Sequence, residues 1–442
     1  MTGSLANLSD PSRRDRRVFL FLQGPHGPFF NALGRMLQAT GAEVWRVGFN
    51  AGDALFWRDR AHYIAFRRPL AEWPARLSGL LDEKGVTDIV LYGDTRPIHA
   101  QATAIARARG LCLHVFEEGY LRPFWVTYER GGSNGHSRLM RLSLDDMRAA
   151  LPKTDRELKP APDRWGDMRQ HVFYGATYHF AVLAGARAYP GFRSHRAISI
   201  AQEFRLYLRR LLLMPWHAIE RRLATARVMA GGFPYHLALL QLEHDASFRA
   251  HGPFATLGEF AETCIRGFAE GAPVHHHLVF KAHPLEDGRS PIARDIRRLA
   301  ARHGLKGRVH FLRGGKLARL LDQAKSAVTV NSTAGQQVLW RGLPLRAFGQ
   351  AVYAKPEFVS TQPLAEFFST PAKPDRDAYN AYRRFLLQTS QVSGGFYSAT
   401  GRRRLLRRVV DMIVDPREPY ETRPEADAAP AQQSRPLSAE GS

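Results

Sequence analysis

Residues Leu111–Val115 read LCLHV and run directly into FEEGY at Phe116–Tyr120, and later in the chain HLVF at His277–Phe280 runs into KAHP at Lys281–Pro284. Each apolar run predicts a buried strand. In open α/β sheets, ligands bind beyond the carboxyl ends of the strands, which is where we expect these polar residues to lie. The sequence therefore predicts two sheets whose polar strand ends meet at one cleft.

Strand and helix patterns alternate on both sides of these two stretches, which is typical of parallel sheets with helices on both faces. We therefore predict an α/β fold, in which two Rossmann-like domains face a cleft, with a helical basic insertion and a C-terminal crossing helix. Further strands are expected at Arg17–Leu22, Glu43–Phe49, Thr87–Leu91, Val309–Leu312 and Ala327–Val330, and helices at Pro74–Gly85 and Lys316–Lys325.

Shifts in composition predict the boundaries of six segments. Residues 1–16 form a flexible N-terminus, 17–150 a first Rossmann-like domain, and 151–232 a linker with a helical, basic segment. Residues 233–374 form a second Rossmann-like domain, 375–414 helices that cross back, and 415–442 a disordered tail rich in Pro, Glu, Ala and Ser.

The charge balance predicts an anionic partner. Lys and Arg number 63 against 41 Asp and Glu, which gives a formal net charge of +22. Such an excess attracts nucleic acid, phospholipid or a charged sugar nucleotide, and its sign alone does not choose among them. No recognised nucleic-acid-binding module is present, so no nucleic-acid partner is expected.

Cysteine usage and hydropathy predict a cytoplasmic protein. Cys112 and Cys264 lie in apolar settings without metal-ligand spacing, as in a reducing compartment. No apolar signal region precedes Val18, and the weakly polar run at 172–186 is shorter than the roughly 20 residues that a membrane-spanning helix needs.

The segment 167–231 interleaves arginines with Trp, Tyr and Leu and contains no clear strand. This pattern fits a monotopic helix that meets lipid phosphates with its arginines. It fits equally a helical subdomain with a solvated basic face.

Candidate catalytic residues follow the two strands. Glu117 and Glu118 form an adjacent carboxylate pair in which the like charge can raise a pKa, as a general base requires; two solvated acids on a loop are the alternative. Lys281 and His283, with Pro284 fixing the backbone, can bind a phosphate or a leaving-group oxygen, although a lone His-Pro pair also occurs by chance.

A third group follows the strand at Ala327–Val330. Asn331, Ser332, Thr333 and Gly335 are expected to cradle a phosphate at the start of a helix, or simply to cap that helix. The run His275–His277 lacks Cys or carboxylate partners, so no metal site is predicted there.

The first half offers residues for an acceptor pocket. Gly24, His26 and Gly27 lie in a Gly-rich turn after the first strand, and Asp53 and Asp94 follow glycines at later strand ends. The aspartates can line the pocket or serve as turn residues.

Taken in order, seven motifs resemble the capsule polysaccharide biosynthesis proteins of the KpsS/LipB type. The resemblance runs from about residue 17 to 350 and rests on GPHGPFF after Gln23, NAGD at Asn50–Asp53, YGDTR at Tyr92–Arg96, EEGY at Glu117–Tyr120, QLEHD at Gln241–Asp245, KAHP at Lys281–Pro284 and NSTAG at Asn331–Gly335.

The resemblance implies a retaining, metal-independent glycosyltransferase with a GT-B-like fold, in which residues 17–150 form the acceptor domain and 233–374 the CMP-sugar-binding domain. It implies transfer of Kdo from CMP-β-Kdo to a (lyso)phosphatidylglycerol-type lipid at the inner face of the cytoplasmic membrane, which initiates the β-Kdo linker of capsular polysaccharide. The implied partners are CMP-Kdo, the phospholipid acceptor, the inner-membrane surface and other capsule synthesis or export proteins, with no cofactor. Bacterial sialyltransferases, which also use CMP-sugars, are a more distant resemblance.

Carried over residue by residue, the resemblance gives each motif a role. Glu118 matches the acid/base carboxylate, but relatives often have Asp there, so the choice between Glu117 and Glu118 stays open. His283, with Lys281 and Pro284, matches the contact to the CMP phosphate. The hydroxyls near that phosphate match Ser332 and Thr333, flanked by Asn331 and Gly335, and the acceptor side takes Gly24, His26, Gly27, Asp53, Asp94 and Arg96.

Two other function classes remain open. A non-catalytic capsule export or assembly factor would use the same cleft only to bind glycolipid. Another CMP-sugar transferase, such as a sialyltransferase, would use the same donor residues with a different sugar.

Overall fold

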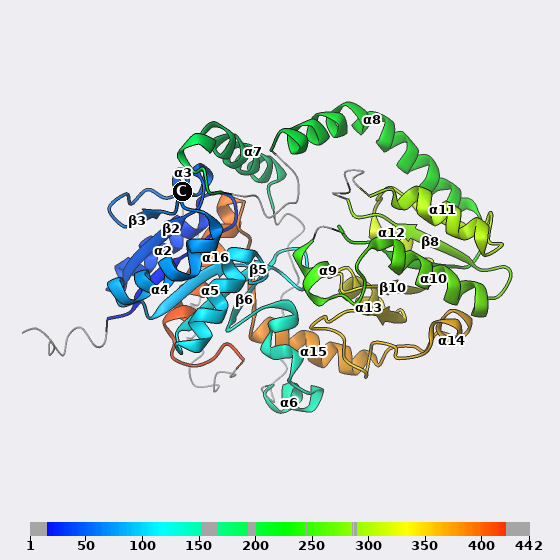
Figure 1. Ribbon diagram of the computed structural model, residues 1–442. Coiled ribbons are helices and arrows are strands. Elements are labelled where there is room, and N and C mark those ends of the chain that lie inside the picture. The colour runs from blue at the N-terminus through cyan, green and yellow to red at the C-terminus, as the bar shows by residue number, and fades with distance from the viewer. Residues whose placement is uncertain are drawn as a thin grey trace, which may run out of the picture.

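The computed structural model describes residues 16–151, 166–192, 200–243, 245–284, 286 and 290–420 of the 442-residue chain. For residues 168, 200–211, 214 and 246 it describes the backbone. The predicted fold class is confirmed, because the chain forms two separate sheets that are mostly or wholly parallel and are covered by helices (Figure 1).

The first sheet has seven strands in the order β12-β6-β5-β4-β1-β2-β3. Strands β1 to β5 run parallel, and β6 and β12 run antiparallel to their neighbours. Phe19 and Phe21 of β1 enter the core under α2 and α16, whereas Val18 and Leu20 enter the core under α4 and α5. Burial on both faces explains why these strands are continuously apolar. The strands are β1 (Val18–Phe21), β2 (Glu43–Gly48), β3 (Tyr63–Ala65), β4 (Asp88–Tyr92), β5 (Cys112–Glu118), β6 (Trp125–Arg130) and β12 (Gln391–Ser393).

The second sheet has five parallel strands in the order β11-β10-β7-β8-β9. One of its faces packs on α10 and α11, and the other packs on a core to which Tyr120 and Leu121 of the first half also belong. The two halves therefore share buried side chains. The strands are β7 (Tyr235–Leu239), β8 (His277–Lys281), β9 (Val309–Leu312), β10 (Ala324–Thr329) and β11 (Leu345–Ala347).

The helices mostly follow the strands they cover. The predicted helix stop at Gly85 is confirmed: this residue has φ 62°, a left-handed conformation that glycine adopts without strain. The helices are α2 (Phe29–Ala39), α3 (Ala51–Leu55), α4 (Trp73–Lys84), α5 (Pro97–Ala108), α6 (Leu144–Ala149), α7 (Met168–Ala184), α8 (Ile200–Ala230), α9 (Ala246–His251), α10 (Leu257–Gly271), α11 (Ile292–Arg302), α12 (Leu317–Leu321), α13 (Gly335–Trp340), α14 (Leu364–Ser369), α15 (Arg376–Gln388) and α16 (Ala399–Val414).

The end of the described chain returns to the first sheet. Helix α15 packs on the second half, β12 pairs with β6, and α16 packs against α2. Residues 375–414 therefore tie the two halves together. None of the helices in the described part of the chain combines the length and apolarity needed to traverse a bilayer.

Three local predictions are wrong. Strand β5 continues through Glu118, because β6 folds back and pairs with Glu117 and Glu118, so the acid pair lies within a strand and not in a loop after it. The helix expected at Lys316–Lys325 is only α12, since β10 already begins at Ala324. The disorder expected from Asp415 does not hold for 415–420, where Tyr420 is 5% exposed and its ring stacks with Phe385.

Candidate functional site

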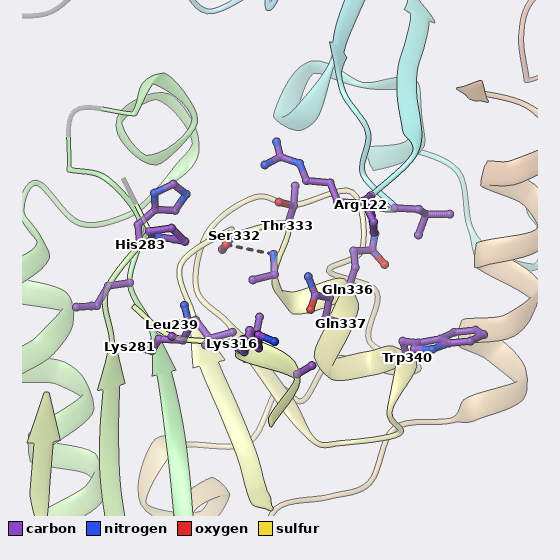
Figure 2. Close-up of a pocket in the computed structure, with 18 of the residues that line it drawn as sticks. Arg122, Leu239, Lys281, His283, Lys316, Ser332, Thr333, Gln336, Gln337 and Trp340 are labelled. Atoms are coloured by element: carbon purple, nitrogen blue, oxygen red, sulfur yellow. Dashed lines mark hydrogen bonds between the residues drawn. The ribbon is translucent and has the colours of Figure 1, made fainter. Parts of the chain in front are cut away.

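A cavity of about 570 Å³ opens between the two halves (Figure 2). The second sheet contributes the carboxyl ends of β7 and β8 and the segment after β10. The first half contributes Arg122, from the loop between β5 and β6, and Trp125 at the start of β6. This is the place where an open α/β sheet binds its ligand.

Positive charge dominates the cavity wall. Lys281 ends β8, is 7% exposed and has its pKa lowered to about 8 by burial. His283, Lys316, Arg122 and Arg383 also line the wall, and none of the described residues that line it is an aspartate or glutamate. The cavity is therefore suited to an anion.

Two hydroxyl-bearing residues face the same space. Ser332 and Thr333 lie in the turn after β10, with the Arg122 side chain above them in the view of Figure 2. The turn is fixed by an N–H of Ala334 that donates to Ser332 Oγ at 3.2 Å and by the Tyr353 hydroxyl, which donates to the Ser332 carbonyl at 2.6 Å.

Not every predicted donor residue lines the cavity. Lys281, His283, Pro284, Ser332 and Thr333 do. The Asn331 side chain instead accepts from Gln241 Nε2 at 2.8 Å and donates to the Ser247 carbonyl at 2.9 Å, so it braces the turn. At Gly335, a Cβ would come within 2.7 Å of the Tyr353 hydroxyl, so this glycine permits close packing.

Sequence reasoning missed the aromatic and cationic wall opposite β8. Trp340 is 52% exposed, and Arg383 lies over its ring at 4.1 Å from the centroid. Tyr379 donates a hydrogen bond to the Gln336 carbonyl at 3.0 Å. Arg122 was missed because the β5–β6 hairpin was not recognised; its position just after FEEGY was the available signal.

The acid pair does not line this cavity. Glu117 and Glu118 are half-buried at the end of β5 and, as neighbours in a strand, point to opposite faces of the sheet. The hairpin connects them to the cavity, because Arg122 follows Glu118 closely and its Nε donates to the Gly119 carbonyl at 3.3 Å.

The two carboxylates have different surroundings. Burial raises the pKa of Glu117 to about 7; the N–H of Glu118, which donates to Glu117 Oε1 at 3.2 Å, works against this shift, and the Glu118 carboxylate adds to it. Glu118 Oε1 accepts a hydrogen bond from the Tyr92 hydroxyl at 3.3 Å. A pKa near neutrality suits Glu117 to exchanging a proton.

Asp53, which was predicted on the acceptor side, is buried and accepts several hydrogen bonds. It is 1% exposed and accepts hydrogen bonds from Gln23 Nε2 at 3.2 Å, the Phe49 N–H at 3.0 Å and the Tyr178 hydroxyl at 3.2 Å. Arg46 adds an ion pair at 3.3 Å. Asp53 thus holds α7 against the first sheet.

Asp94 is likewise 1% exposed, and its carboxylate has hydrogen-bond partners. It accepts from the Ser133 N–H at 3.0 Å and lies 3.0 Å from His136 Nδ1. Both aspartates thus hold neighbouring segments in place, and their role in an acceptor pocket stays a prediction. Arg96 lies over the Tyr92 ring at 5.3 Å.

The Gly-rich turn after β1 lies under α7. The His26 ring stacks on Tyr178, with the centroids 4.5 Å apart. A Cβ on Gly27 would come within 3.0 Å of the Tyr174 ring, and one on Gly24 within 2.5 Å of the Phe30 ring. These glycines let α7 and α2 approach the turn closely.

One group of possible metal ligands occurs among the described residues, and it lies away from the cavity. Ligand atoms of Asp88, Cys112 and His114 lie within 4.8 Å of one another at the amino ends of β4 and β5. Asp88 is already bound by Arg17 at 2.5 Å and His114 at 2.8 Å, so the residues fit an ion-pair network and not an ion. His277 Nδ1 similarly lies 2.8 Å from His310 Nε2.

Comparison with known proteins gives consistent matches along the chain. The family model described as "Capsule polysaccharide biosynthesis protein" matches residues 87–397. Capsule polysaccharide modification protein LipB of Neisseria meningitidis serogroup A is 32% identical over 383 residues, which are 86% of this chain and 91% of LipB. Capsule polysaccharide export protein KpsS of Escherichia coli is 32% identical over 387 residues, which are 86% of this chain and 97% of KpsS.

Among solved structures, the β-Kdo 2,7-transferase of Thermosulfurimonas dismutans KpsC is similar with a TM-score of 0.43 and 11% identity. The match covers 90% of this chain and 100% of that one.

Proposed function

Because the chain belongs to the capsule polysaccharide biosynthesis protein family, we propose that it is a retaining glycosyltransferase that moves Kdo from CMP-β-Kdo to a (lyso)phosphatidylglycerol-type lipid and so initiates the β-Kdo linker of capsular polysaccharide. One observation carries the proposal: a cationic cavity, whose described lining residues include no aspartate or glutamate, lies at the carboxyl ends of the parallel strands. A nucleotide-activated acidic sugar is an anion of suitable size for such a cavity.

In this proposal the second half holds the donor. Lys281 and His283 bind the single phosphate of the CMP group, with the Ser332 and Thr333 hydroxyls beside it. When the bond from the sugar to the phosphate breaks, the negative charge that develops on the leaving CMP is stabilised by these groups. The proposal assigns this neutralisation to side chains, with no metal ion or other cofactor.

The acid pair acts on the acceptor in the same scheme. The acceptor hydroxyl forms the new bond to the anomeric carbon on the face from which CMP leaves, as retention requires, and its proton goes to a carboxylate of the pair. Glu117 suits this transfer because burial raises its pKa to about 7. Glu118, the residue that matches the family's acid/base position, is held by the Tyr92 hydroxyl next to it.

A transfer assay tests the proposal. Purified protein is incubated with CMP-Kdo, generated in situ, and a short-chain phosphatidylglycerol, and the lipid is analysed by mass spectrometry. We expect a product heavier by one Kdo. CMP-sialic acid in place of CMP-Kdo should give no product, and a product with the sialyl donor alone would replace the proposal with a sialyltransferase.

Two variants separate catalysis from binding. His283→Ala should lose CMP binding and transfer together, whereas Glu117→Gln should lose transfer and keep CMP binding. If wild-type protein binds glycolipid but yields no product with either donor, the protein is an export or assembly factor and the enzymatic proposal is overturned.

A further inference from the structure

Helices α7 and α8 each expose a continuous apolar stripe. On α7, the side chains of Val172, Phe173, Phe180 and Leu183 are 50% to 71% exposed. At 3.6 residues per turn, these four positions fall within an arc of about 100° on one face of the helix. The stripe therefore follows from the helix geometry and is not a scatter of single surface residues.

The stripe on α8 is narrower and equally exposed. Leu212, Trp216, Ile219 and Leu223 are 51% to 73% exposed and fall within an arc of about 60°. In the view of Figure 1, both helices lie along the same edge of the molecule, α7 over the first half and α8 over the second.

The opposite face of α7 is fixed to the predicted acceptor side. The Tyr178 hydroxyl donates to Asp53 at 3.2 Å and accepts from Asn50 Nδ2 at 2.8 Å, while its ring stacks on His26. A Cβ on Gly52 would come within 2.6 Å of the Tyr178 ring, which shows how closely the helix sits.

Residues of α8 outside the stripe fix this helix to the cavity. Glu220 pairs with Arg313 at 3.0 Å, and Arg221 and Thr225 pack on Gly314 and Gly315, of which Gly315 lines the cavity. The two helices therefore connect their outer stripes to the two sides of the candidate site.

We infer that the outer faces of α7 and α8 dock on the surface of a bilayer that contains anionic phospholipid. The sequence supplies the complementary charge: between Arg187 and Arg222 there are eight arginines and two glutamates. Helices with an apolar stripe, a Trp at the boundary and flanking arginines lie in the interface, with their apolar face among the acyl chains. That the docked lipid also supplies the acceptor rests on the proposed function.

Vesicle sedimentation tests the docking without any substrate. Wild-type protein should sediment with vesicles of phosphatidylglycerol and phosphatidylcholine in equal parts, and much less with phosphatidylcholine alone. Phe180→Asp on α7 and Trp216→Asp on α8 should each reduce partitioning by about tenfold or more. Val274→Asp is the matched control, because Val274 is 83% exposed outside both helices and should have no effect.

Two results would overturn the inference. One is equal partitioning of wild-type protein and the α7 and α8 variants. The other is self-association of the protein through the stripes. Light scattering would then give the wild type a mass larger than that of a monomer, and Phe180→Asp and Trp216→Asp would reduce it to the monomer mass.

Transfer assays then separate the two proposals. Phe180→Asp should keep wild-type turnover of a water-soluble short-chain acceptor and lose turnover of phosphatidylglycerol embedded in vesicles. An equal loss with both acceptors would contradict docking as the role of Phe180. Inactivity of the wild type with both acceptors, while vesicle binding depends on the stripes, would sink the proposed function and leave the docking intact.

Discussion

Lys281 is expected to lower the stability of the folded protein and to take part in binding the CMP phosphate. Lowering the pKa of this buried ammonium from 10.5 to about 8 corresponds to roughly 3 kcal/mol of lost stability at pH 7, because folding disfavours its charged form. Lys281→Met should therefore raise the melting temperature at pH 7 and, at the same time, weaken CMP binding in calorimetry. A variant that is less stable and still binds CMP as the wild type does would contradict this role.

The same residue predicts a pH dependence of binding. As the pH rises from 7 to 9, Lys281 loses its proton, so the Kd for CMP should increase in the wild type. Since Lys281→Met has no proton to lose there, its Kd should stay nearly constant over this range. Parallel pH curves for the two proteins would assign the titration to another group.

Substitutions of Glu117 and Glu118 can show which of the two carboxylates accepts the proton. With the pKa of Glu117 raised to about 7, the rate should rise with pH up to about that value as Glu117 becomes able to accept a proton. Glu117→Gln should lower kcat by about 100-fold and remove this rise. If Glu118→Gln removes the rise instead, the proton acceptor is Glu118.

At the scale of elements, the docking of α7 depends on small residues at its contacts, and Gly52 is one of them. A Cβ at Gly52 would lie 2.6 Å from the Tyr178 ring, so Gly52→Val should displace α7 and cost about 2 kcal/mol in the free energy of unfolding. Gly79 in α4 is the control, because a Cβ there meets nothing within 4 Å, and Gly79→Ala should stabilise by about 0.5–1 kcal/mol. Urea denaturation measures both, and equal effects would refute the packing argument.

The elements also show what sequence could predict. Continuous apolar runs such as Val18–Phe21 identified the buried parallel strands, because burial on both faces leaves no polar position. Strands β6 and β12 were missed. Strand β6 runs antiparallel to its neighbours, and β12 pairs with a strand that is far away in the sequence, so neither is marked by a local periodic pattern of apolar residues. Lys281, His283, Ser332 and Thr333 were found because strand ends mark them, whereas Arg383 and Trp340 reach the cavity only through tertiary packing.

At the scale of the molecule, Glu129 lies beneath the junction of the two halves. It is fully buried, and the hydroxyls of Tyr120 (2.6 Å) and Ser137 donate to its carboxylate, with Tyr420 as a further partner. Burial raises its pKa from 4.5 to about 7, and these hydroxyls only partly oppose the shift. The folded state thus binds this proton more tightly than the unfolded state does.

The sign of the resulting pH effect follows from linkage. The stabilisation from protonated Glu129 is fully present below pH 4.5 and is lost as the pH rises through about 7. Because Glu129→Gln cannot ionise, its stability relative to the wild type should increase between pH 4.5 and 7 and then level off. A difference that stays constant with pH, measured by urea denaturation, would show that Glu129 does not titrate in this range.

The central claim is that the cavity between the two sheets holds the donor nucleotide. A crystal structure of the protein with CMP tests it most directly. We expect the CMP phosphate within hydrogen-bond distance of Lys281 and His283, beside Ser332 and Thr333, in the cavity of Figure 2. CMP bound elsewhere, or a phosphate turned away from Lys281 and His283, would contradict it.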